Sequence, residues 1–478
     1  MLRTFLKDSV VYTVPSVISR GLAVFLVPLY TRVLSPGDFG SLDLLIVFAG
    51  IVNVTIALEV SQGVARFYAG EQDPKSKVAY ASSAFWFTLA CYSVFALLML
   101  ALADPLSSWI LGQVGLETAF RIGIFYIWIN GLFYLIQNQF RWELRSKEYA
   151  VTSMLMSFAT AVSAVWLAYG LQWGLEGLLI AMAAGSLSGA VLGLWWLRGT
   201  FRLRFDVARL REMLAFSIPL VFSGVAVWIS LYIDRLMINH FLTIDEVGLY
   251  GVGYRLASIA GLAMVGFKGA LSPLVYTYYR EADTPRQLAR IFRFFLTYAL
   301  MLFLGLSLFA SEILRTMTTQ AYYGAATIIV YLVPALLLAN MYIFAPGIGI
   351  AKRTQYLIWI NIGGALLNGA LNYALIPILG IIGAALATML NYLAVFVCYM
   401  VLSQRLYYVP HKWRAISAAV FIAGSIAALV PQWSLPDDFR WIVYVLALIV
   451  FFFLALGLGM VKSYEISLVW RLVANRIF

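Results

Sequence analysis

The chain is poor in charge and in the residues that build catalytic or metal centres. Only 12% of its 478 residues are charged, and it has two histidines and two cysteines. Soluble domains carry about a quarter charged residues, so a soluble globular fold is excluded. Cys91 and Cys398 both lie in apolar runs and His240 and His411 both lie near the ends of such runs, which argues against disulfide frameworks, metal sites and histidine-based catalysis.

The chain contains long apolar runs instead. Hydrophobic residues make up 63% of the sequence and the mean hydropathy is +0.89. A helix needs about 20 mostly apolar residues to cross the hydrocarbon core. We therefore predict an all-α polytopic membrane protein with 14 transmembrane helices. The apolar runs lie at residues 10–33, 41–64, 80–103, 119–140, 149–169, 174–197, 212–236, 248–270, 291–313, 325–348, 356–378, 380–403, 414–431 and 439–461.

Basic residues set the orientation. The first run reaches Tyr30 without a small-residue cleavage site, so we interpret it as a retained span rather than a removed signal. Most Lys and Arg fall on one side when the termini and every second loop share that side, which predicts two cytoplasmic termini. The net charge of +11 then reflects topology and anionic lipid headgroups, and no nucleic-acid partner is indicated. The tail from Lys462 is predicted to be an amphipathic surface helix.

Two phrases in the sequence repeat each other. "LSPGDFGSLDL" begins at Leu34, and "LTIDEVGLYGV" begins 208 residues later at Leu242, with Gly40 matched to Gly248. "RSKEYA" and "KRTQYL", and "GLEGLLIA" and "GIIGAALA", recur in the same order at nearly the same offset. A constant offset between ordered landmarks indicates an internal duplication.

The duplication predicts the domain organisation. Residues 1–200 would form an N-lobe of spans 1 to 6, residues 201–405 a C-lobe of spans 7 to 12, and residues 406–478 two extra C-terminal helices with the tail. Because six is even, both lobes enter the membrane from one side, and their pseudo-two-fold axis runs along the membrane normal. Two lobes around a central cavity suit alternating access, and one duplicated chain supplies the whole pathway, which favours a monomer.

Polar residues inside the spans are the candidate functional groups, because they are costly in hydrocarbon. Ser16 and Arg20 share a face of the first span, with Arg20 near the middle of the bilayer by helical rise. Arg20 is the strongest candidate, although pairing with an acidic neighbour is the alternative. Arg255 could also snorkel to the interface. Arg66 and Lys268 at cytoplasmic helix ends fit ordinary positive-inside anchoring as well.

Carboxylates and neutral polar stripes complete the set. Asp43, Glu59 and Asp234 are the available ligands if a sodium ion or proton is coupled to transport, although Asp234 and Arg235 also fit an interfacial pair. No other cofactor and no metal site is expected. Amides and phenols that could line a cavity, or join helices instead, are Asn130, Tyr134, Gln137, Asn361, Asn368 and Asn391.

The two repeated phrases, "RWELRSKEYA" after span 4 and "GLEGLLIA" opening span 6 resemble the polysaccharide flippase (Wzx-like) branch of the multidrug/oligosaccharidyl-lipid/polysaccharide exporter superfamily. The resemblance covers about residues 1–405, and spans 13 and 14 look like the additions of its 14-helix members, including lipid II flippases. It implies movement of a polyprenyl-pyrophosphate-linked oligosaccharide from the cytoplasmic to the periplasmic face of the bacterial inner membrane. It also implies membrane lipids, a polysaccharide polymerase and glycosyltransferases as partners.

Charge favours this function over its rivals. A pyrophosphate headgroup needs cations, which Arg20, Arg255, Arg66 and Lys268 would supply. A multidrug or organic-cation antiporter, the alternative within the superfamily, would depend on Asp43, Glu59 or Asp234. A membrane enzyme such as a polymerase or ligase would need a large outer loop, and none fits between the spans. The chain is therefore expected to be a transporter and not an enzyme.

Overall fold

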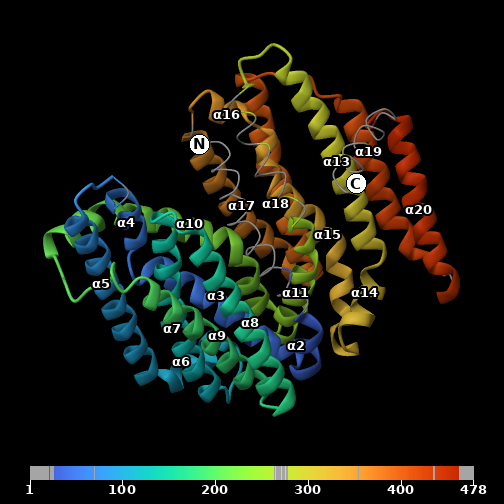
Figure 1. The fold of residues 1–478 in the computed structure, drawn as a ribbon. Helices are drawn as coiled ribbons and strands as arrows, with labels where there is room; N and C mark the ends of the chain where they lie inside the picture. The colour runs from blue at the N-terminus through green and yellow to red at the C-terminus, as the bar shows by residue number, and fades with distance from the viewer. Residues whose placement is uncertain are drawn as a thin grey trace, which may run out of the picture. The chain divides into compact units, whose positions relative to one another are not determined.

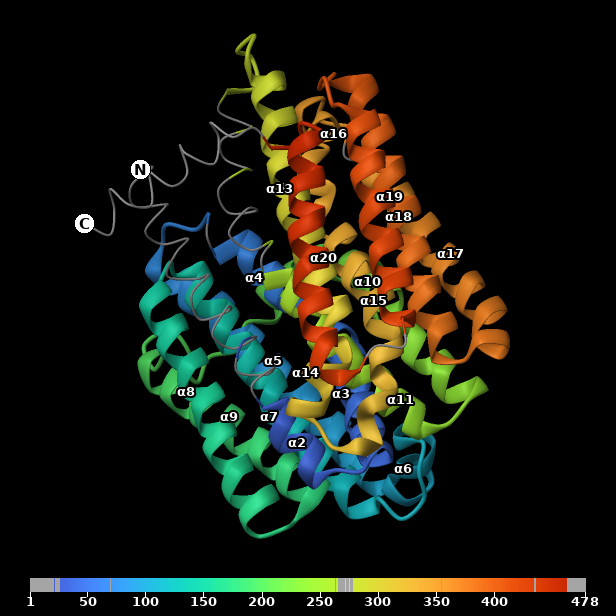
Figure 2. The same cartoon turned by 90° about the vertical axis from the view of Figure 1, so that its right-hand side faces the viewer.

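The computed structural model describes residues 26–68, 70–262, 278–353, 355–433 and 436–461, together with positions 21, 264, 271 and 275. These residues form helices joined by short connections (Figures 1 and 2). Twelve of the helices are long and apolar enough to cross a membrane. The predicted Ser16, Arg20 and Lys268 sites, and the tail from Lys462, lie outside the described residues.

The described residues form two compact units. The first holds the described residues within 1–252, 318–322 and 368–381, and the second holds those within 253–317, 323–367 and 382–478. Helices α11 (Ile244–Ala257), α17 (Gln355–Leu379) and α18 (Ile381–Leu406) contribute to both units. The lobe boundaries at residues 200 and 405, and the symmetry of the lobes, stay predictions.

The first unit contains most of the helices before residue 252. These are α2 (Val27–Val33), α3 (Pro36–Thr55), α4 (Val60–Tyr68), α5 (Pro74–Ala101), α6 (Ala103–Leu111), α7 (Glu117–Trp142), α8 (Ser146–Ala164), the π-helical turn η1 (Val165–Gly170), α9 (Gly174–Trp196) and α10 (Val207–Phe241). Helices α7, α8 and α9 pack side by side in both views (Figures 1 and 2). A side chain at Gly189 or Gly193 of α9 would collide with Phe133 or Ile136 of α7, so small residues set this close packing.

Local sequence signals explain several helix starts in this unit. Ser35 caps α3 by accepting from the Asp38 amide, while the Asp38 side chain accepts from the Ser35 amide, and Pro36 occupies the first turn. This reciprocal capping box supplies partners for amides that a helix start leaves free. Asp73 caps α5 and Asp206 caps α10 in a similar way. The phrase "LSPGDFG" therefore starts a helix, because its Ser, Pro and Asp are residues that favour a helix N-terminus.

The second unit is built around α13 (Thr284–Leu308). Figure 1 shows α13 beside α15 (Ala326–Leu338), α19 (Trp413–Leu429) and α20 (Asp437–Gly457), and these helices are in contact. The buried Arg293 of α13 donates to the carbonyls of Gly459 and Met460, just beyond the end of α20. A cation at a helix C-terminus is favourable, so Arg293 fastens the last described helix to α13. The shorter elements are α14 (Ala310–Met317), η2 (Gln320–Ala325), η3 (Met341–Phe344), α16 (Gly347–Ile350) and η4 (Val430–Gln432).

The predicted all-α membrane fold is confirmed, and the twelve described spans each overlap a predicted apolar run. The two remaining runs, 10–33 and 248–270, include residues outside the described ranges, so the count of 14 stays a prediction. Two boundaries were wrong. The run 41–64 is not one helix, because α3 ends at Thr55 and Leu58 and Glu59 adopt left-handed backbone. The run 325–348 breaks after Leu338 into η3 and α16.

Candidate functional site

The repeated phrases contact each other in the first unit. A Cβ at Gly40 of α3 would overlap the carbonyl oxygen of Ile244, and a Cβ at Gly248 of α11 would overlap the carbonyl oxygen of Pro36. Pro36 and Ile244 are separated by the same 208 residues as Gly40 and Gly248. The contact is therefore reciprocal, because each glycine faces a backbone carbonyl oxygen of the other segment. We call these four residues the glycine seam.

A buried ion network lies on the same two helices and α10. Arg235 is 4% exposed, and its Nε lies 2.9 Å from Asp43 Oδ2 while its Nη1 lies 3.0 Å from Asp234 Oδ1. The Tyr250 hydroxyl donates to Asp234 Oδ2 at 2.6 Å. Gly251 leaves room for this network, because its Cβ would lie 3.1 Å from Asp43 Oδ2. Two of the three predicted ion-coupling carboxylates are thus brought together.

This network contains the Asp234–Arg235 pair that the sequence suggests. Both residues are less than 5% exposed, so the pair lies inside the protein. Tyr250 is not among the residues that the sequence singles out. The adjacent Asp–Arg pair at the end of an apolar run marks this position in the sequence, whereas nothing in the sequence indicates the contact of Arg235 with Asp43.

Glu59 lies apart from the Arg235 network. It lines a separate cavity of about 20 Å³ with residues of α3, α4, α5 and α7, including Asn53, Ser61, Thr88 and Tyr134. Of the predicted polar stripe on α7, only Tyr134 reaches this cavity. The structure thus separates the three candidate carboxylates into two locations within the first unit.

Several predicted cavity-lining residues join helices, which is the other role that the sequence allows them. Gln137 is 7% exposed, donates to Thr152 Oγ1 at 2.8 Å and accepts from Ser153, which ties α7 to α8. Asn130 donates to Ser186 Oγ at 3.4 Å, linking α7 to α9. These bonds are the interhelical bonding that polar side chains commonly provide in membranes.

The asparagines of α17 and α18 fall into different environments. Asn368 is 1% exposed, donates to the Ser230 carbonyl and accepts from Asn372. Asn361 accepts from the Tyr399 hydroxyl at 2.8 Å. Asn391 is buried, and its Oδ1 has no hydrogen-bond partner among the described residues.

The two described cationic candidates also differ. Arg66 is exposed in the last turn of α4, which fits the anchoring alternative as well as a headgroup contact. Arg255 is half-buried in the last turn of α11, and the Ser258 hydroxyl donates to its carbonyl.

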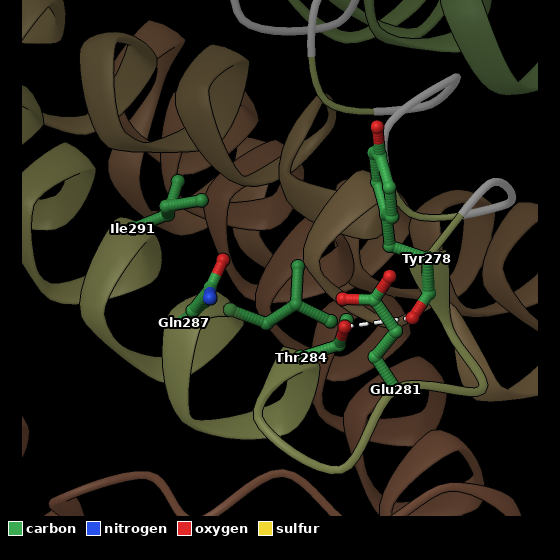
Figure 3. A pocket seen from close by; sticks show the side chains of 6 residues that line it. Tyr278, Glu281, Thr284, Gln287 and Ile291 are labelled. Carbon is green, nitrogen blue, oxygen red and sulfur yellow. Dashed lines mark hydrogen bonds between the residues drawn. The ribbon is translucent and has the colours of Figure 1, made fainter.

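A larger cavity of about 160 Å³ occurs in the second unit. Figure 3 shows Tyr278, Glu281, Thr284, Gln287 and Ile291 around it, at the start of α13. The Thr284 hydroxyl donates to the Tyr278 carbonyl at 2.7 Å. None of the predicted site residues lines this cavity. No cluster of three or more His, Cys, Asp or Glu side chains suited to a metal ion occurs in the part of the chain that the structure describes.

Twelve membrane-length helices and buried polar groups within the first unit define a polytopic membrane protein. Residues 29–327, more than half of the chain, match the sequence profile of the family described as polysaccharide biosynthesis protein, so the chain belongs to that family. The predicted resemblance is confirmed.

A curated relative agrees with this assignment. The chain is 27% identical over 262 residues to the succinoglycan biosynthesis transport protein ExoT of Rhizobium meliloti, covering 53% of this chain and 50% of that protein. The match thus spans about half the length of this curated relative.

The fold is similar to a structure of the lipid II flippase MurJ in an inward closed conformation. The TM-score is 0.69 at 15% identity, covering 96% of this chain and 100% of that one. A multidrug resistance MATE family transporter of the MOP superfamily, in an inward-facing conformation, gives a TM-score of 0.62 at 15% identity. That match covers 84% of this chain and 95% of that one. At these identities the likeness establishes the fold.

Proposed function

We propose that the protein is an alternating-access flippase that moves a polyprenyl-pyrophosphate-linked oligosaccharide from the cytoplasmic to the periplasmic leaflet of the bacterial inner membrane. The observation that carries the proposal is the combination of family and fold. A member of the polysaccharide biosynthesis protein family folds along 96% of its length like a lipid II flippase. A relative named for succinoglycan transport supports the same substrate class.

Two of the three candidate carboxylates are unavailable to an organic cation, which argues against the multidrug alternative at those positions. An organic cation would need an acidic group free to pair with it, whereas Asp43 and Asp234 both bind Arg235 within hydrogen-bond distance. Displacing a buried, hydrogen-bonded guanidinium is costly. The Arg235 network therefore offers no free carboxylate to an organic cation.

The remaining parts of the proposal come from the sequence. Arg20, Arg255, Arg66 and Lys268 would bind the pyrophosphate by charge-assisted hydrogen bonds. Both termini would face the cytoplasm, where glycosyltransferases build the substrate, and a polymerase would use the flipped product. A sodium ion or proton would drive transport through one of the carboxylates, and one chain would form the whole pathway.

The test is flipping by the purified full-length chain in liposomes. Polyprenyl-pyrophosphate-linked oligosaccharide is placed in both leaflets, and the sugar that an external glycosidase can cleave is measured with time. Without flipping, about half of the sugar stays protected, and with flipping nearly all of it becomes cleavable. Persistent protection under both sodium and proton gradients would refute the proposal. Raised drug tolerance on overexpression, dependent on Asp43, Glu59 or Asp234, would support the antiporter instead.

A further inference from the structure

The break between α3 and α4 has a defined backbone conformation that neighbouring helices hold in place. Leu58 and Glu59 have φ angles of 50° and 51°, in the left-handed region that residues with a Cβ rarely adopt. The carbonyl of Leu58, released from helical bonding, accepts from the Ser217 hydroxyl of α10 at 2.7 Å. The surrounding helices therefore hold an unfavourable backbone in place, and its effect is to bring Glu59 to the wall of the 20 Å³ cavity.

Side chains pack closely around this cavity. Gly131 of α7 lies against the Tyr92 ring, and any larger residue there would overlap it. Tyr92 is thereby placed to donate its hydroxyl to Asn53 Oδ1 at 2.7 Å. Four helices (α3, α4, α5 and α7) contribute lining residues, all within the first unit.

Three oxygen atoms at this cavity lack hydrogen-bond partners among the described residues. They are Glu59 Oε2, Ser61 Oγ and Thr88 Oγ1, and the side chains of Ser61 and Thr88 belong to residues 4% and 1% exposed. Buried polar groups are nearly always paired, so a group of three unpaired oxygens indicates a missing partner. The volume exceeds the 10–15 Å³ that one water-sized occupant needs, but not by enough for a larger ligand.

The chemistry of the walls defines the occupant. Gln62 hydrogen-bonds the Glu59 carboxylate, and no described Lys or Arg forms an ion pair with it. The other titratable groups facing Glu59 are the Tyr92 and Tyr134 phenols, which are uncharged near neutral pH. A carboxylate within a membrane needs a positive partner, and carboxylate and hydroxyl oxygens suit a small hard cation.

We propose that this cavity binds one exchangeable monovalent cation, either a sodium ion or a proton. Glu59 supplies the countercharge, and the Ser61 and Thr88 hydroxyls supply the remaining oxygen contacts. The site selects Glu59 from the three candidate carboxylates, because Asp43 and Asp234 bind Arg235. The coupling of this cation to transport rests on the proposed function, whereas its binding does not.

The test measures thermal unfolding of the purified full-length protein by tryptophan fluorescence. NaCl is titrated against choline chloride at constant ionic strength, and the series is repeated from pH 5 to pH 8. Sodium binding gives a saturable rise in Tm with NaCl, and E59Q abolishes that rise. Proton binding gives a Tm that is independent of sodium but changes with pH, and E59Q removes that part of the pH dependence.

Two controls keep the result interpretable. Glu176→Gln removes an exposed glutamate from the same unit and should behave as wild type. If E59Q does not fold, Thr88→Val and Ser61→Ala provide the test, because both keep the carboxylate. Each should raise the NaCl midpoint about tenfold if sodium binds, or shift the pH midpoint by about one unit if a proton binds. Identical sodium and pH responses in wild type and all cavity variants would overturn the proposal and leave a water-filled structural cavity.

The readout needs no lipid-linked sugar. Failure of flipping with an intact sodium or pH response would therefore refute the proposed function and leave the cation site standing. Flipping that persists without a sodium or pH response would support the proposed function and refute the cation site.

Discussion

Arg235 holds two carboxylates from separate parts of the chain in the first unit. Removing one partner of a buried ion pair costs about 3–5 kcal/mol, because the remaining charge stays in a poor solvent. Arg235→Met should therefore strongly lower the free energy of unfolding, measured by thermal or denaturant unfolding in detergent. Arg121→Gln is the matched control, since Arg121 pairs with Asp104 at the surface, where an ion pair contributes less than about 1 kcal/mol.

A double variant separates charge from packing in this network. Adding Asp43→Asn to Arg235→Met removes one of the two uncompensated carboxylates. If charge is the cause, the double variant recovers part of the lost stability. An additive further loss would show that Arg235 acts through packing alone.

His411 makes a residue-scale prediction about pH. Its ring lies between Phe292 and Trp413, with centroid distances of 4.8 Å and 5.0 Å, and burial lowers the pKa of His411 to about 4. As the pH falls from about 6.5 to about 4, the unfolded chain binds a proton at this position that the folded chain does not. The free energy of unfolding should therefore decrease across this window.

His411→Phe should flatten this dependence in pH-scanned thermal unfolding, because no proton can then bind the unfolded chain at this position. His240→Phe changes an exposed histidine and should leave the slope unaltered. An unchanged slope in His411→Phe would contradict the assignment.

At the scale of elements, the glycine seam requires two residues without side chains. Gly40→Ala or Gly248→Ala would place a methyl group against a backbone carbonyl that cannot rotate away. Overpacking of this kind costs about 1–3 kcal/mol, and each variant should lower the Tm accordingly. Gly305→Ala in α13 meets open space and is the control, expected to be neutral or slightly stabilising. Equal Tm values for all three variants would show that α3 and α11 separate readily.

The elements also show what local sequence can and cannot specify. Apolar runs located the helices because crossing a bilayer requires length and hydropathy. They missed the break at Leu58 and Glu59, because hydropathy does not record backbone conformation. The carboxylates Asp43 and Asp234 were candidates as polar residues in spans, yet their shared partner was missed. An ion pair between Asp43 and Arg235 joins residues 192 positions apart and leaves no periodic signal.

The repeat was more informative than any single motif. Because Gly40 and Gly248 were matched by offset, the sequence already identified the two positions that meet in the seam. It could not show that they touch each other. A duplication specifies which segments are equivalent, whereas their contact depends on the packing of α3 against α11.

For the whole molecule, the central prediction is that the substrate headgroup meets positive charge inside the membrane. Arg20→Ala should abolish polysaccharide output in a cell that depends on this chain, while the protein still reaches the membrane in normal amount. The reason is that a pyrophosphate group leaving water needs a cationic partner inside the bilayer. Immunoblotting of membranes and extraction of surface polysaccharide measure the two quantities. Arg121→Ala, which removes an exposed cation, is the control.

Conservative replacement sharpens this prediction. Arg20→Lys keeps the charge but loses the planar pair of donors that matches phosphate oxygens, so output should fall partially rather than vanish. If Arg20 merely pairs with a carboxylate to hold helices together, Arg20→Ala lowers the amount of folded protein as well as the output. Normal output from Arg20→Ala would remove the cationic site from the mechanism, even if flipping in liposomes is confirmed.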